Sequence, residues 1–161
     1  MKDEIPAVSA GGEVLQLVCF KLAGEEYAVN ITSVQEVIRV PAITPVPQMP
    51  DFVLGVSNIR GTIVPVCDLR KLFRLPQKPG NGLAKILILE AGRARFSIIV
   101  DEVLDNIKLE KTLIDPAPDV KLKMEKACIS GLGEVADRMI IILDVSKVSE
   151  VINSEIDKTR V

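Results

Sequence analysis

The chain has 161 residues, enough for one domain or two very small ones, and 48% of them are hydrophobic. Aromatic residues make up only 3% and Trp is absent, so the core must be aliphatic, and the many Val and Ile residues favour β-strands. The net charge of -2 argues against nucleic acid as a partner, and the absence of His removes the commonest general base and metal ligand.

The first half of the chain predicts short strands after a disordered tail over 1–13. These strands are expected over 14–22, 27–31, 34–40, 55–59 and 62–67. Four prolines between positions 41 and 50 exclude a helix interior and a central strand, and indicate an extended connector. Asp51 predicts the cap of a single helical turn over 51–54, and Asp68 the cap of a short helix over 68–73.

The second half follows the same plan after a turn-rich stretch over 75–82. Its strands are expected over 85–90, 95–100, 102–109, 129–133 and 138–144. A proline-containing connector at 115–118 interrupts them. The last predicted element is an amphipathic helix over 146–158, capped by Asp144 or Ser146, with one apolar stripe facing the core.

The two halves of the chain resemble each other. In each half a Gly precedes, by 13 positions, an Asp that closes an apolar strand. The pairs are Gly55 with Asp68 and Gly131 with Asp144, 76 residues apart. An upstream element repeats at an offset of 69, with Tyr27 matching Phe96. The repeat predicts two small β-barrels, roughly over 14–80 and 81–145, with strand exchange between them left open, and such a pair favours binding over catalysis.

Neither a catalytic nor a metal site is expected. Asp68 and Asp144 could be taken as paired carboxylates, but helix capping explains each of them better. Cys19, Cys67 and Cys128 lack metal-ligand spacing and are interpreted as small buried hydrophobic residues. We therefore predict no catalytic residue, no metal and no cofactor.

The segment Asn58-Ile59-Arg60-Gly61 is the strongest local indication of a site. Gly61 permits a positive φ in a tight turn between two strands, so Arg60 projects from a rigid position. Arg60 either faces solvent or is oriented toward a partner by an ion pair with Glu36, the one acid in the strand over 34–38. The sequence leaves both interpretations open.

These segments together resemble the CheW adaptors of bacterial chemotaxis and the homologous regulatory domain of the CheA kinase. The resemblance covers about 14–152 and rests on 20–29 with 34–37, 43–47, 55–70, 100–103 and 131–144. It implies a mainly all-β CheW-like domain of two packed five-stranded SH3-like barrels. A short internal helix is implied within that domain, and a C-terminal helix and tail over 146–161. It also implies an adaptor without catalysis.

The resemblance further implies two partners: the CheA regulatory domain and the helical hairpin tip of a methyl-accepting chemoreceptor. A receptor-binding groove is implied between the barrels, containing Val34, Glu36, Gly55, Asn58, Arg60, Asp101 and Val103. The protein would be cytoplasmic, monomeric in isolation and recruited to membrane-associated receptor arrays, without inserting into the membrane or binding nucleic acid.

Three alternatives stay open at this level. The first is a CheW-like scaffold of another two-component system, such as pilus or motility control. The second is an enzyme or small-molecule site in the seam between the barrels, although the missing His and scattered Cys residues argue against it. The third is a domain cut from a CheA-type kinase, against which the polar N-terminal segment beginning at Met1 argues.

Overall fold

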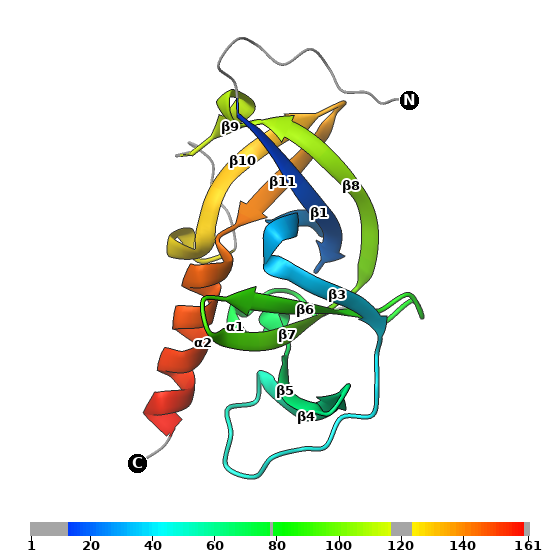
Figure 1. Ribbon diagram of the computed structural model, residues 1–161, viewed down its shortest axis with the longest axis vertical. Coiled ribbons are helices and arrows are strands. Elements are labelled where there is room, and N and C mark those ends of the chain that lie inside the picture. The colour runs from blue at the N-terminus through cyan, green and yellow to red at the C-terminus, as the bar shows by residue number, and fades with distance from the viewer. Residues whose placement is uncertain (1–12, 78, 117–123, 160–161) are drawn as a thin grey trace.

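The computed structural model describes residues 13–77, 79–116 and 124–159, which form two curved β-sheets with a long helix along their side (Figure 1). The six-stranded sheet contains, in spatial order, β8 (Glu102–Glu110), β1 (Val14–Leu22), β2 (Glu25–Asn30), β11 (Arg138–Leu143), β10 (Ile129–Val135) and β9 (Ile114–Asp115). The five-stranded sheet contains β3 (Val34–Arg39), β6 (Lys85–Ala91), β7 (Ala94–Val100), β5 (Thr62–Cys67) and β4 (Val53–Ile59). The helical elements are η1 (Ile31–Ser33), α1 (Leu69–Leu72), η2 (Lys111–Leu113), η3 (Lys126–Cys128) and α2 (Val145–Thr159).

The mainly β fold class with one short and one C-terminal helix is confirmed, and the ends of the predicted elements shift by at most two residues. The two-residue β9 gives one sheet a sixth strand. The predicted helical turn over 51–54 is wrong, because Val53 already pairs with Cys67 in the sheet. A hydrogen bond of 3.0 Å from Val53 N to Pro50 O closes a simple turn there. The expected tail lies outside the described residues except for Glu13, as does the end of the 115–118 connector.

Each sheet takes strands from both halves of the chain. The β1–β2 hairpin lies in the sheet that contains β8 to β11, and the β6–β7 hairpin lies in the sheet that contains β3 to β5. The register of the two sheets is the same. Equivalent strand pairs are Val66–Ser97 with Ile142–Ala28, and Val34–Leu89 with Val103–Phe20. These pairs differ by the offsets of 76 and 69 seen in the sequence. The sheets are thus two versions of one unit with exchanged hairpins, while the division of the chain into domains stays a prediction.

Each sheet curls around an interior core of its own. We call the curled sheets the six-stranded barrel and the five-stranded barrel. In β1, Leu17 and Cys19 point into the six-stranded barrel, whereas Phe20 and Leu22 point into a larger core between the barrels. The outer helix α2 contributes Val145, Val148 and Ile152 to this larger core. Burial of one such aliphatic side chain stabilises the fold by about 1.5–3 kcal/mol, so the shared core holds the barrels together.

The two repeated Asp residues cap helices, as predicted. Asp68 Oδ1 accepts a hydrogen bond of 2.9 Å from Arg70 N at the start of α1. Asp144 Oδ1 accepts one of 3.2 Å from Lys147 N at the start of α2. The equivalent strands β5 and β11 are therefore each followed by a helix that an Asp caps.

Candidate functional site

The turn between β4 and β5 holds Arg60 at the end of the five-stranded barrel. Its central residues both have positive φ, +52° at Arg60 and +85° at Gly61, which is the geometry that two-residue hairpins favour. Asn58 Oδ1 accepts a hydrogen bond of 2.9 Å from Gly61 N across the turn. Asn58 and Gly61 therefore fix the backbone from which Arg60 projects.

Arg60 forms the predicted ion pair with Glu36 of β3. Arg60 Nε donates to Glu36 Oε1 at 3.2 Å, and a second, shorter bond joins Arg60 Nη2 to Glu36 Oε2. The hydrogen bonds from Arg60 lower the pKa of the Glu36 carboxyl, and Glu36 raises the pKa of Arg60. Because β3 and β4 are the two edges of the sheet, this pair helps to close the five-stranded barrel.

Arg60 and Glu36 line a polar cleft at the mouth of the five-stranded barrel, which we call the Arg60 cleft. Its volume is about 450 Å³, and its lining residues are Gln35, Glu36, Ile59, Arg60, Thr62, Val64, Ile88 and Arg95. Ile88 and Ile59 belong to the interior core of the barrel, so the cleft has an apolar floor and a charged rim. The Arg60 side chain is 76% exposed and Glu36 30%, so both can be reached from outside.

Gly55 lies deeper in β4 and acts through its backbone. A Cβ atom at this position would lie 2.3 Å from the carbonyl oxygen of Thr44, and φ is +150°. The neighbouring Val56 forms an isolated β-bridge with Thr44. Gly55 thus lets the proline-rich connector over 41–50 pack against the barrel, and it offers no side chain to a partner.

Val34 and Val103 occupy equivalent positions in the two barrels and are both partly buried. Both pack against the core between the barrels. The two side chains therefore help to hold the barrels together, and only part of each reaches the surface.

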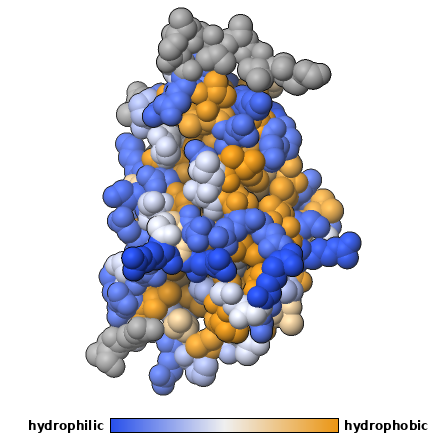
Figure 2. All heavy atoms as spheres, in the orientation of Figure 1, coloured by the Kyte–Doolittle hydropathy of each residue, from blue (hydrophilic) through white to orange (hydrophobic). Residues whose placement is uncertain are grey.

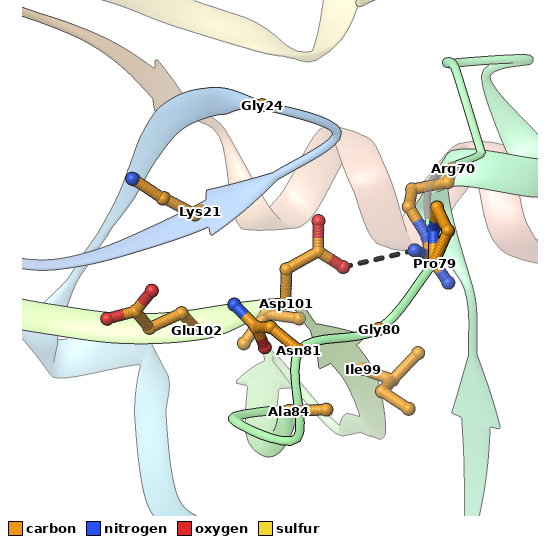
Figure 3. Close-up of a pocket in the computed structure, with 11 residues that line it drawn as sticks. Lys21, Gly24, Arg70, Pro79, Gly80, Asn81, Ala84, Ile99, Asp101 and Glu102 are labelled. Atoms are coloured by element: carbon orange, nitrogen blue, oxygen red, sulfur yellow. Dashed lines mark hydrogen bonds and ion pairs between the residues drawn. The ribbon is translucent and has the colours of Figure 1, made fainter.

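Asp101 lies in a second cleft, between the two barrels (Figure 3). Its carboxylate accepts a hydrogen bond of 2.9 Å from Ala23 N and one of 3.1 Å from Arg70 Nη1. Arg70 also donates to Asp68 at 3.2 Å, which raises the pKa of Arg70. Asp101 therefore ties the β1–β2 turn of one barrel to α1 at the end of the other.

The structure brings Glu36, Asn58 and Arg60 together at one site. Asp101 lines a different cleft, and Gly55 contributes only a close backbone approach. The assignment of all seven predicted residues to a receptor-binding groove stays a prediction.

A three-residue network at the mouth of the six-stranded barrel was not predicted. Arg138 Nη1 donates to Asp105 at 2.9 Å, and Arg138 Nε donates to Glu26 at 3.0 Å. Arg138 lowers the pKa of Asp105 mainly through its hydrogen bonds. The repeat in the sequence could have revealed this network, because Asp105 lies 69 positions after Glu36.

The same mouth brings Cys19, Glu26 and Asp105 within 4.8 Å of one another through their potential ligand atoms. The Arg138 guanidinium bridges the two carboxylates and already supplies their positive charge. Burial raises the pKa of the Cys19 thiol to about 11, so it is protonated at neutral pH. These residues fit an arginine better than a metal ion.

The cysteines are buried and free, as predicted. Burial is the main cause that raises the pKa of Cys67 to about 12 and that of Cys128 to about 11. A thiolate nucleophile is therefore not available at neutral pH.

Comparison with known proteins identifies the family. The model of the CheW-like domain matches residues 16–152, which is most of the chain. The chain belongs to the CheW family of chemotaxis scaffold proteins. This membership confirms the expected family and the adaptor class, and it places this CheW-like chain among scaffolds and not among enzymes.

The similarity to named relatives extends over most of the length of both chains. The chain is 34% identical to chemotaxis protein CheW of Klebsiella aerogenes over 132 residues, covering 82% of this chain and 80% of that protein. It is 32% identical to chemotaxis protein CheW of Helicobacter pylori over 136 residues, covering 84% and 82%. The crystal structure of the scaffolding protein TtCheW from Thermoanaerobacter tengcongensis superposes with a TM-score of 0.76 at 34% identity, covering 82% of this chain and 90% of that one.

Among the described residues, no helix is both long enough and apolar enough to cross a membrane.

Proposed function

We propose that this chain couples the helical hairpin tip of a methyl-accepting chemoreceptor to the regulatory domain of the histidine kinase CheA. The observation that supports this proposal is the oriented Arg60, held by Glu36 and by the Asn58–Gly61 turn in a CheW-like domain. The protein would act in the cytoplasm and join membrane-associated receptor arrays, and it would be a monomer in isolation.

The surface around Arg60 suits a helical partner. A guanidinium has five N–H donors, and Glu36 uses only some of them, so others remain for an acceptor on the partner. Exposed apolar side chains lie on β3, which carries Glu36, and on β5, which follows Arg60, with Val37 41% and Ile63 61% exposed. Such a mixture of a central arginine and apolar contacts is typical of interfaces that bind an amphipathic helix.

Polar and apolar areas alternate over the rest of the visible face. Figure 2 shows a belt of hydrophilic side chains across the middle of the molecule, with hydrophobic atoms exposed on both sides of it. An adaptor needs two such contact surfaces held in a fixed relation. The core shared by the two barrels supports this, because it joins side chains of β1 and β2 to those of β6 and β7.

The proposal is tested by measuring binding to two probes encoded in the same genome: a chemoreceptor-tip fragment and the CheA regulatory domain. We expect wild type to bind both, and Arg60→Ala to lose about tenfold or more in affinity for the receptor fragment alone. Arg93→Ala is the matched control, because Arg93 is exposed in the β6–β7 turn and lines neither cleft.

Two results would contradict the proposal. Binding to neither probe would favour a scaffold of another two-component system, such as pilus or motility control. Equal loss of both partners in Arg60→Ala would show that the ion pair with Glu36 only maintains the fold.

A further inference from the structure

The two barrel mouths are equivalent by the internal repeat, yet they carry different charges. The equivalent residues are Glu26 and Arg95, Asp105 and Glu36, and Arg138 and Thr62. In the six-stranded barrel the three residues form a complete network, with one guanidinium between two carboxylates. In the five-stranded barrel only Glu36 keeps the charge of its counterpart.

At the mouth of the five-stranded barrel, the short Thr62 stands where the six-stranded barrel has the long Arg138. In the six-stranded barrel the long Arg138 side chain extends over the mouth to both carboxylates. Thr62 is too short to do so, and it lines an open cleft of about 450 Å³ instead. Arg60 reaches in from the turn and neutralises Glu36.

Among the residues that the structure describes, Arg95 then has no acidic partner. Its side chain is exposed and lines the same cleft as Arg60. Glu90 is its cross-strand neighbour, but no ion pair joins Arg95 to any carboxylate among the described residues. The rim of the cleft therefore holds two guanidinium groups and one carboxylate, the reverse of the six-stranded mouth.

We propose that the Arg60 cleft is a carboxylate-binding site, in which an Asp or Glu side chain of the partner lies between Arg95 and Arg60. That the partner is the chemoreceptor tip rests on the function proposed above. Two guanidinium groups can each donate paired hydrogen bonds to one carboxylate. Val64, Ile59 and Ile88 form an apolar floor beneath these groups, against which the methylene groups of an Asp or Glu side chain can pack. Arg95 is then a specificity residue that selects an acidic contact.

The first test compares Arg95→Glu with Arg93→Glu in binding to the chemoreceptor-tip fragment. Arg95→Glu installs the acid that Glu26 provides in the other barrel, and both substitutions change the net charge equally. We expect Arg95→Glu to weaken binding by about tenfold to a hundredfold, with Arg93→Glu within about twofold of wild type. Thermal melting checks that both variants fold. Equal affinities of the two variants would overturn the inference while leaving the proposed function intact.

The second test does not depend on the receptor. Glutarate, a soluble dicarboxylate, is titrated into the full chain while the arginine Nε–H groups are followed by NMR. We expect saturable shifts of Arg95 and Arg60 that disappear for Arg60 in Arg95→Ala. Equal, non-saturating shifts of all arginines would overturn the carboxylate site. Localised glutarate binding without any binding of the receptor fragment would support the site and contradict the proposed function.

Discussion

Arg60 is placed by its immediate neighbours before any partner binds. The positive φ at Arg60 and Gly61 sets the direction of the Arg60 side chain, and the Glu36 carboxylate accepts hydrogen bonds from the Arg60 guanidinium. Pairing of this kind limits the rotamers of a long side chain, so less conformational entropy is lost on binding. The direction of the charge therefore depends on the local turn and on one contact with β3.

The ion pair predicts a pH response at Glu36. Because Arg60 holds the pKa of Glu36 below its ordinary value of 4.5 in the folded state, the pair stabilises the fold above that value and loses its effect as pH falls through the lowered pKa. In Arg60→Ala we expect the Glu36 pKa to rise toward 4.5, measured by NMR titration of the side-chain carboxyl. Arg93→Ala should leave it unchanged, and an unchanged titration in Arg60→Ala would contradict the ion pair.

The three thiols should be inert in the folded protein. Their pKa values are raised to between about 11 and 12, mainly by burial. We expect no reaction with a chromogenic disulfide reagent at pH 8 in buffer, and full reaction of Cys19, Cys67 and Cys128 in denaturant. Rapid labelling of the native protein would mean that the barrels open more readily than their packing indicates.

At the scale of elements, local pattern predicted most strands and both helices. The alternation of apolar residues and the capping Asp residues predicted these elements. The repeat predicted two similar barrels. The two-residue β9 was missed because so short a strand has no pattern of its own. Val53 was taken for a helical turn because its partner Cys67 lies on another strand, which sequence alone does not show.

The glycine at the start of the repeated unit predicts an element-scale effect. Gly55→Ala would place a Cβ atom against the Thr44 backbone in a conformation that L side chains rarely adopt. We expect the free energy of unfolding to fall by about 1–3 kcal/mol or more, measured by denaturant unfolding. Gly80→Ala is the control, since a Cβ there meets nothing within 4 Å, and the change should stay within about 0.5 kcal/mol. Equal stability of the two variants would contradict the close approach.

For the whole molecule, the decisive arrangement is that two barrels exchange hairpins and share one core. The repeat predicted two units, but which strands each hairpin pairs with depends on tertiary contacts that no local pattern encodes. Asp101 shows the same limit at the site. Its bond to Arg70 spans 31 positions of sequence and joins the barrels. The Glu36–Arg60 pair could be proposed because Glu36 is the one acid in its strand and Arg60 lies in the turn between two apolar strands.

The link between Asp101 and Arg70 should stabilise the pair of barrels. The two side chains are partly buried, 30% and 17% exposed, so their interaction is less screened than a surface pair. A double-mutant cycle with Asp101→Ala and Arg70→Ala should give a coupling energy of about 0.5–3 kcal/mol in denaturant unfolding. The exposed Glu155–Lys158 pair of α2 serves as the control and should give about 0.2–0.5 kcal/mol. Additive effects at Asp101 and Arg70 would contradict the link.

An adaptor must hold receptor and kinase at the same time. The most direct measurement is sedimentation of the chain mixed with a chemoreceptor-tip fragment and the CheA regulatory domain from the same genome. We predict a three-component complex that forms only when the chain is present, and that loses the receptor fragment alone in Arg60→Ala. Competition between the two partners for the chain, or binding of neither, would contradict the adaptor function.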